Sequence, residues 1–176
     1  MSGYVDLHIH SNRSSDGDFS PAELVRMAKK AGFVAISIAD HDTVAAYPDA
    51  MEAADGSGVE VVPNMEVTTL FDGREFHLLL PFADWESPVI GRIGERVSAG
   101  RAIEARERVE KLRELGLDIS WDEVEAASKS GPPLGVSIAQ ILLDKPGSKN
   151  DPALKKYYER DAREWAPYHF YRDYFM

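Results

Sequence analysis

The sequence that decides the fold is Val5-Asp6-Leu7-His8-Ile9-His10, in which apolar and polar side chains alternate. A period of two is the pattern of a β-strand, so we predict a strand here. Because alternate residues share one face of a strand, His8 and His10 project from the same side and could reach one cation. Two neutral imidazoles aimed at a shared point form half of a metal site. The alternative interpretation is a pair of hydrogen-bonded histidines on a half-buried strand.

The residues that follow predict a helix and a second strand. Ser20 is the expected N-cap of a helix over residues 21–31, which begins with Pro21 and stops at Gly32. Residues 34–39, Val-Ala-Ile-Ser-Ile-Ala, form a short apolar run typical of a buried strand. Strand, helix and strand together predict one βαβ unit, which places the chain in the α/β class.

The pattern continues with a second helix, which we expect to run through about Ala54. Another strand is predicted from Val59. Residues 66–71 and 75–82, separated by the turn sequence Asp72-Gly73, then predict a hairpin or a bent pair of strands.

The second half of the chain differs from the first in its residue composition. Residues 89–116 are rich in Arg and Glu and predict one long helix or two stacked helices. Residues 120–123, Ser-Trp-Asp-Glu, resemble a capping box that opens another helix, and residues 137–143 predict a further short one. The last twenty residues are loaded with aromatic side chains, which normally need something to pack against. We therefore expect a chain that is cut short, and the aromatic C-terminus is a candidate surface for self-association.

Composition excludes several classes of function. The chain has 176 residues, with 30 Asp and Glu against 20 Lys and Arg, for a net charge of −10. This length fits one domain, or a domain with a small appendage. The acidic balance argues against stable binding of duplex nucleic acid by charge alone. The absence of cysteine removes thiolate ligands and nucleophiles, so any metal ligands must be His, Asp or Glu. Since the sequence has no long apolar run, we expect a cytoplasmic protein that does not enter a membrane.

Two loops carry further candidate site residues. Asp40-His41-Asp42-Thr43 directly follows the second strand, at the carboxyl end where α/β folds bind their ligands. His41 is therefore expected to point into a site, while Asp42 either has a catalytic role or caps the next helix. Asp16 lies in the loop after the first strand, where its ordinary role is a turn or a cap.

Two more candidates lie in the predicted hairpin. Glu66 has apolar neighbours, and a charge in that setting needs a partner or a metal, so we interpret it as a bridging carboxylate. His77 begins an apolar strand. Taken alone, a histidine there is more often a core residue than a ligand.

The combination of these motifs resembles the polymerase and histidinol phosphatase (PHP) superfamily of metal-dependent phosphoesterases. The matching sequence lies in residues 6–17, 20–24 and 39–43. It is most similar to a stand-alone bacterial branch of exoribonucleases and nucleoside 3′,5′-bisphosphate phosphatases. Residues 116–121 and the long charged helix are similar to the helical subdomain inserted in that branch. The resemblance thus divides the chain into a metal-binding region, residues 1–88, and a helical insert with an aromatic end, residues 89–176.

The resemblance implies a partial, distorted β/α barrel, related to TIM barrels, that binds up to three divalent cations. Its ligands, carried over by position, would be His8, His10 and Glu66 for one cation, Glu66 and His77 for a second, and Asp16 and His41 for a third. Mixed imidazole and carboxylate ligands suit Mn, Fe or Zn better than Mg.

The chain also departs from the family pattern. A later Ala-His-Pro-like motif and a C-terminal Asp and His have no counterpart here, and Asn64-Met65 replace the glycine expected before the bridging Glu66. A complete barrel usually needs more than about 200 residues. A truncated and inactive metal-binding fragment is therefore one alternative.

The expected function is hydrolysis of a phosphate ester by metal-activated water. The substrate would be a small phosphorylated molecule, such as a nucleotide, or a short oligonucleotide. A histidinol-phosphate type phosphatase is a second alternative, although such a protein is expected to differ after Asp42 and to lack the helical insert.

Overall fold

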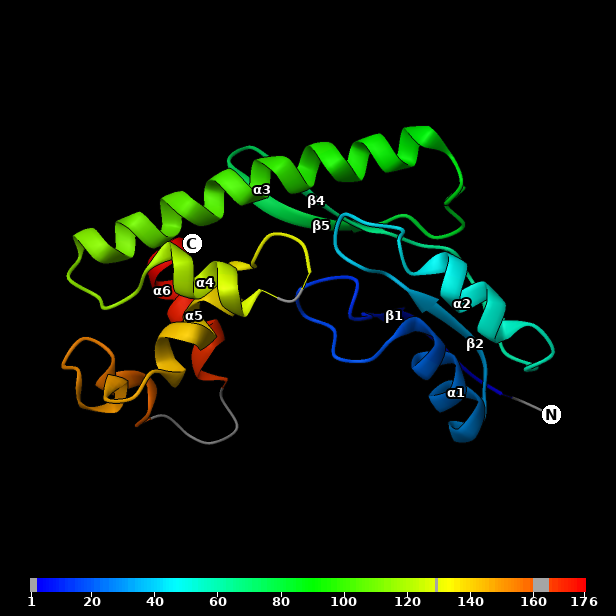
Figure 1. Ribbon diagram of the computed structural model, residues 1–176, viewed down its shortest axis with the longest axis horizontal. Helices are drawn as coiled ribbons and strands as arrows, with labels where there is room; N and C mark the ends of the chain where they lie inside the picture. The colour runs from blue at the N-terminus through cyan, green and yellow to red at the C-terminus, as the bar shows by residue number, and fades with distance from the viewer. Residues whose placement is uncertain (1–2, 129, 160–164) are drawn as a thin grey trace. The chain divides into compact units, whose positions relative to one another are not determined.

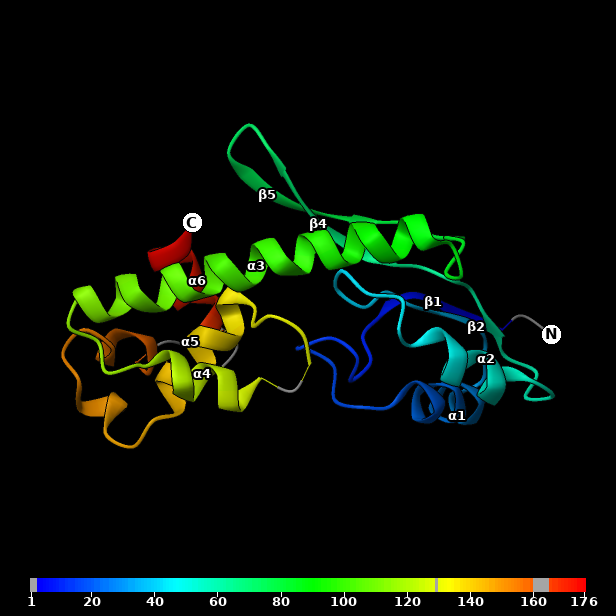
Figure 2. The ribbon, with the colours of Figure 1, turned by 45° about the horizontal axis from the view of Figure 1, so that its top comes forward.

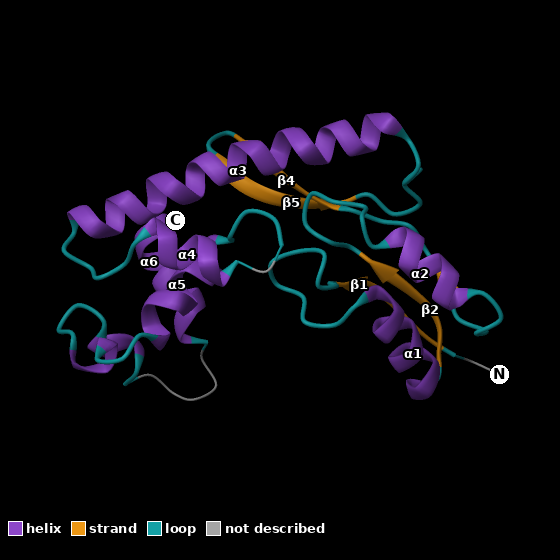
Figure 3. Cartoon of the chain, in the orientation of Figure 1, coloured by secondary structure: helices purple, strands orange, loops and turns teal. Residues whose placement is uncertain are grey.

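The computed structural model describes residues 3–128, 130–159 and 165–176 (Figure 1). The chain divides into two compact units, residues 1–100 and 101–176. Strands occur in the first unit, whereas the second is helical over its described residues (Figure 3). The α/β class predicted from the sequence is confirmed. The predicted division after residue 88 falls where helix α3 (Pro88–Glu114) begins, and it stays a prediction.

The first unit is built on a parallel sheet of strands β1 (Tyr4–Ile9), β2 (Phe33–Ile38) and β3 (Glu60–Val61), with β2 in the centre. Helices α1 (Pro21–Ala31) and α2 (Tyr47–Ala54) connect these strands and lie together on one side of the sheet (Figure 2). Ile9 pairs with Ile38, so β1 and β2 end side by side. This register places the loops that follow both strands at one edge of the sheet, where α/β folds bind ligands.

Helix α1 has the bounds that its sequence predicts. The Ser20 hydroxyl accepts a hydrogen bond from the Glu23 amide at 3.3 Å, and the Glu23 carboxylate accepts one from the Ser20 amide at 2.8 Å. This capping box satisfies two amide groups that a helix start would otherwise leave unpaired. The apolar face of the helix then packs into the core of the first unit, whose buried residues are Val25, Ala28, Ile36, Ile38, Ala46, Tyr47, Ala50, Val59 and Val61.

The predicted hairpin consists of β4 (Glu66–Phe71) and β5 (Arg74–Leu79), which pair antiparallel. Asp72 and Gly73 both adopt positive φ, 50° and 71°, as the tight turn between two twisted strands requires. The second strand is shorter than predicted, because it ends at Leu79 and Phe82 adopts a φ of 62° that breaks the extended backbone. Within the described residues the strands form the three-stranded sheet and this hairpin. The predicted barrel therefore stays a prediction.

The second unit contains the end of α3 and the helices α4 (Trp121–Ala127), α5 (Gly135–Asp144) and α6 (Ala166–Phe175). Short 3₁₀ turns lie at Ser148–Asn150 and Lys155–Tyr157. Residues 89–114 form one continuous helix rather than two stacked ones. The Ser120 capping box is present, with Glu123 as its partner.

Part of the aromatic C-terminal sequence forms the core of this unit. Tyr157 and Phe170 are buried, and Phe170 stacks on Tyr174 with 4.4 Å between ring centroids. Trp165 and Tyr168 are exposed. The buried rings thus find their packing partners within the unit, and self-association stays a prediction.

Over the described part of the chain, we find no helix with both the length and the apolarity needed to cross a bilayer.

Tyr47 joins the sheet to the segment that leads into β4. Its buried hydroxyl donates to the Ile38 carbonyl and accepts from the Asn64 amide at 2.5 Å. In Tyr47→Phe this buried amide loses its acceptor, so we expect the free energy of unfolding to fall by about 1–3 kcal/mol, measured by urea denaturation. Tyr4→Phe, at an exposed ring, is the control and should change stability little. Equal midpoints for Tyr47→Phe and the wild type would contradict this role.

Candidate metal centre

Histidine and carboxylate side chains from the parallel sheet, the loops that follow it and the hairpin converge on one cluster. His8 lies on β1, and His10 directly follows that strand. The other members come from the loop after β1, the loop after β2 and the two strands of the hairpin: Asp16, His41, Glu66 and His77. All six predicted metal ligands are thereby brought together.

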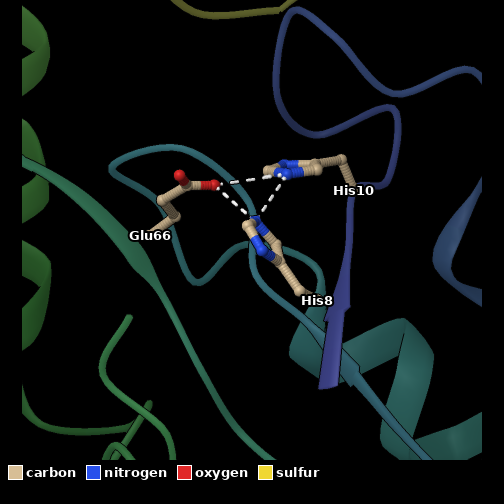
Figure 4. Close-up of side chains that lie close together, drawn as sticks. All are labelled: His8, His10 and Glu66. Atoms are coloured by element: carbon tan, nitrogen blue, oxygen red, sulfur yellow. Dashed lines mark hydrogen bonds and ion pairs between the residues drawn. The ribbon is translucent and has the colours of Figure 1, made fainter. Parts of the chain in front are cut away.

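Glu66 lies at the centre of the cluster. Its Oε2 is 2.8 Å from His8 Nε2 and 3.2 Å from His10 Nε2, while its Oε1 is 2.9 Å from His77 Nδ1. Figure 4 shows His8 and His10 extending from the end of β1 toward this carboxylate. The Glu66 side chain is only 6% exposed, so its carboxylate meets these imidazoles largely away from water.

A second carboxylate, Asp16, lies on the other side of His10. Asp16 Oδ2 is 3.2 Å from His41 Nε2, and Asp16 Oδ1 is 3.6 Å from His10 Nδ1. His41 Nε2 also lies 3.8 Å from Glu66 Oε2. His10 and His41 therefore connect the two carboxylates.

The donor atoms form three overlapping groups, each with its atoms within 4.8 Å of one another. The groups are His8, His10 and Glu66; His10, Asp16 and His41; and His41, Glu66 and His77. These differ from the sets carried over from the family, because His10 joins Asp16 and His41, and His41 also joins Glu66 and His77.

The shorter separations between these atoms match those of neighbouring ligands on one divalent cation. Metal–ligand bonds of about 2.0–2.2 Å, at tetrahedral or octahedral angles, separate neighbouring donors by roughly 2.8–3.6 Å. His8 Nε2 and His10 Nε2 are 3.1 Å apart, within that range. Among the described residues, the buried Nδ1 atoms of His10 and His41 have no hydrogen-bond partner. The residues present thus offer the nitrogen and oxygen donors that borderline divalent metals prefer.

The electrostatics of the cluster keep its carboxylates ionised. Burial raises the pKa of Glu66, but hydrogen bonds with His10, His77 and His8 outweigh burial and hold the pKa well below its usual range. Burial also opposes ionisation of Asp16, yet its contact with His41 lowers the pKa of Asp16 to about 2. Both groups therefore carry negative charge at neutral pH, as cation binding requires.

Asp42, predicted to be catalytic or a helix cap, belongs to none of the three donor groups. Its carboxylate accepts hydrogen bonds from the Thr68 amide at 2.8 Å and the Thr68 hydroxyl at 3.0 Å. The helix-cap alternative is wrong, because α2 begins at Tyr47 with Ala46 in the N-cap position. Asp42 instead ties the loop after β2 to strand β4, and its catalytic role stays a prediction.

Two further carboxylates, not predicted as site residues from the sequence, lie next to the cluster. Glu75 Oε1 lies 3.2 Å from His77 Nε2, on the far side of that ring from Glu66. Its spacing of two residues from His77 on a strand is a signal that could have found it. Asp40 is buried below the loop that carries Asp16, and burial raises its pKa, against hydrogen bonds from Ser11 and Ser14. Its place directly after an apolar strand, beside His41, was the available signal.

Comparisons with known proteins identify the region around the cluster. A family profile described as the PHP domain matches residues 6–89, which contain every member of the cluster. Residues 6–89 therefore resemble the PHP domain family. The predicted resemblance to this superfamily is thus confirmed.

Two bacterial relatives extend the similarity into the helical second half of the chain. The 5′-3′ exoribonuclease of Haemophilus influenzae is 32% identical over 158 residues, which cover 89% of this chain and 57% of the relative. The 3′,5′-nucleoside bisphosphate phosphatase of Chromobacterium violaceum is 26% identical over 67% of this chain and 41% of the relative. The chain therefore spans about half the length of the curated relatives it matches.

A solved structure supports the same fold. A protein of Bifidobacterium adolescentis, assigned as a metal-dependent phosphoesterase, superimposes with a TM-score of 0.70 at 26% identity. The match covers 92% of this chain and 57% of that protein.

The geometry of the cluster predicts that substitution of its histidines lowers the metal content of the chain. In the double variant His8→Ala/His10→Ala, two imidazoles that face Glu66 Oε2 are removed, so we expect the Mn²⁺ content after loading and desalting to fall by at least one ion per chain. Elemental analysis by mass spectrometry measures this content. His169→Ala, which changes a histidine of the second unit, is the control and should leave the stoichiometry unchanged. Equal Mn²⁺ content in the double variant and the wild type would remove the assignment of these ligands.

Proposed function

We propose that this chain acts as a metal-dependent phosphoesterase that hydrolyses a nucleotide or short oligonucleotide phosphate. The observation that carries this proposal is the position of Glu66. One buried carboxylate has imidazoles on both of its oxygens, at separations that neighbouring metal ligands show. Such a carboxylate is suited to bridge two cations, which is the arrangement of many phosphate-hydrolysing sites.

The chain's own residues supply the binding framework. Glu66 would be shared between cations, His8 and His10 would hold one side, His77 the other, and Asp16 with His41 would complete a third site. Divalent cations bound there supply Lewis acidity, since they lower the pKa of a bound water toward neutrality and offset the charge of the phosphoryl oxygens.

The remaining chemistry needs no protein nucleophile. The chain has no cysteine, and the described cluster consists of histidines and carboxylates. Water is therefore the proposed nucleophile: its oxygen bonds to phosphorus, the ester P–O bond breaks, and the water's proton leaves to solvent or to the departing alkoxide.

The donor set favours particular metals. Imidazole and carboxylate together suit Mn, Fe or Zn, whereas Mg prefers all-oxygen sites that retain water. Bound cations would also explain how a chain with a net charge of −10 attracts an anionic substrate.

The relatives support a nucleotide or oligonucleotide substrate, since their names describe an exoribonuclease and a nucleoside bisphosphate phosphatase. We also propose a cytoplasmic location for this chain, because nucleotides and short oligonucleotides occur in the cytoplasm. A second candidate function is metal binding without turnover. It is favoured by the three donor groups themselves, which would bind cations without any further residue.

Phosphate release separates these functions. We expect the Mn²⁺-loaded chain to release inorganic phosphate from adenosine 3′,5′-bisphosphate or mononucleotides from a short 5′-phosphorylated RNA, and not phosphate from histidinol phosphate. Glu66→Gln should lower kcat by about 100-fold or more, because the substitution removes the charge that would bridge the cations.

Glu60→Gln is the matched control, since Glu60 lies exposed on β3 of the same sheet. Metal uptake without turnover on either nucleotide substrate would support the binding-only alternative. Turnover on histidinol phosphate alone would favour the other phosphatase class.

A further inference from the structure

We propose that Asp40 is a positioning residue that holds the loop of residues 11–16, so that Asp16 can share a cation with His10 and His41. The inference rests on the proposed function, because it concerns one of the three donor groups of the metal centre. It adds a residue that belongs to none of those groups.

Asp40 is a buried carboxylate whose hydrogen bonds go to this loop. It is 1% exposed. Asp40 Oδ1 accepts from the Ser11 amide at 2.6 Å, and Oδ2 accepts from the Ser11 hydroxyl at 2.6 Å. A buried carboxylate needs such donors, and its hydrogen bonds are among the stronger ones in proteins. Asp40 therefore fixes the start of the loop to the end of β2.

Ser14 extends this connection to Asp16. Its buried hydroxyl lies 2.7 Å from Asp16 Oδ1 and 3.2 Å from Asp40 Oδ1. One hydroxyl proton is thus shared between the two carboxylates. Asp40 restrains Ser14, and Ser14 contacts the carboxylate that faces His41.

The loop is also held from its other end. A Cβ added to Gly17 would lie 2.0 Å from the Ser11 carbonyl oxygen, so only glycine allows the backbone to approach this closely. The Asn12 amide donates to the Phe19 carbonyl at 2.8 Å and closes the loop. Residue 16 therefore lies between two constraints, the Asp40 carboxylate and the close packing at Gly17.

The expected effect is selective. His8, Glu66 and His77 lie on β1, β4 and β5, outside the restrained loop. Loss of the Asp40 carboxylate should release Asp16 while the donor groups around Glu66 keep their geometry. A residue that only stabilised the fold would lower the affinity of all the groups together.

The experiment is a titration of the intact, metal-free chain with Mn²⁺, followed by calorimetry and elemental analysis. For Asp40→Ala we expect one Mn²⁺ site to weaken by about 10–100-fold, the range found when a residue that orients a ligand is removed, while the other sites are unchanged. With Co²⁺ as the probe, the visible absorption of one ion should change and that of the others should persist. Asp40→Asn should be intermediate, since an amide oxygen still accepts from the Ser11 amide.

Two further variants keep the test decisive. Gly17→Ala displaces the same loop from its other end and should give the same selective loss, which decides the matter if Asp40→Ala fails to fold. Asp49→Asn is the matched control: Asp49 pairs with Arg13 of this loop at 2.5 Å, but both side chains are nearly half exposed, and such pairs contribute little.

The outcomes separate the two proposals. A wild-type chain that takes up no Mn²⁺ would refute the proposed function. A wild-type chain that binds Mn²⁺, with Asp40→Ala and Gly17→Ala variants that bind every ion equally well, would refute the role of Asp40 alone. Uniform weakening of all sites in folded variants would likewise show that Asp40 only stabilises the fold.

Discussion

The buried charge of Glu66 is the constraint on which the rest of the first unit depends. Taking a carboxylate out of water is costly unless other groups compensate for its charge. Here the compensation comes from imidazoles that belong to different segments: His8 on β1 and His77 on β5 contact opposite oxygens of the carboxylate. The chain must therefore bring the end of a parallel sheet and both strands of a hairpin to one point. A pair of divalent cations would compensate the charge of Glu66 more strongly than imidazoles do. The groups that would stabilise this buried carboxylate are therefore the ones that the proposed hydrolysis needs.

Backbone hydrogen bonds around Glu66 hold the converging segments in place. The Glu66 amide donates to the Asp40 carbonyl at 3.2 Å, and the Asp42 amide donates to the Glu66 carbonyl at 2.9 Å. These two bonds form a short parallel bridge between the segment after β2 and the start of β4, which places His41 beside Glu66. Side chains then reinforce the bridge, because Asp42 holds Thr68 on β4 and Asp40 holds the loop after β1. The two aspartates that flank His41 thus hold two different segments, strand β4 and the loop after β1. Neither aspartate belongs to the donor groups, yet each holds a segment that carries a predicted metal ligand.

Local patterns predicted the elements well where one signal dominated. The alternation in residues 5–10 predicted β1, and Ser20 with Glu23 predicted the start of α1, since both patterns depend only on neighbouring residues. Prediction was weaker where distant contacts decide. A helix cap is one of the two roles that the sequence predicts for Asp42, from its place before a helical segment, whereas its carboxylate accepts hydrogen bonds from Thr68, which is distant in sequence. The aromatic C-terminus was expected to lack packing partners, but Phe170 packs with Tyr157 and Tyr174 inside the second unit. The hydrophobicity of an aromatic side chain predicts that it will be buried, but it does not identify the residues that pack against it.

The sequence by itself determined the α/β class, the faces of the strands and the types of ligand available. Strand periodicity and side-chain chemistry are local properties, and the absence of cysteine leaves only imidazole and carboxylate donors. Only the tertiary structure decided how those donors are grouped. His10 and His41 each belong to two groups, and Asp40 supports a ligand from outside them, because these relations depend on the register of β1 with β2 and on the approach of β4. Distances of about 3 Å between residues far apart in the chain result from packing and hydrogen bonding across the whole unit, which no local pattern encodes.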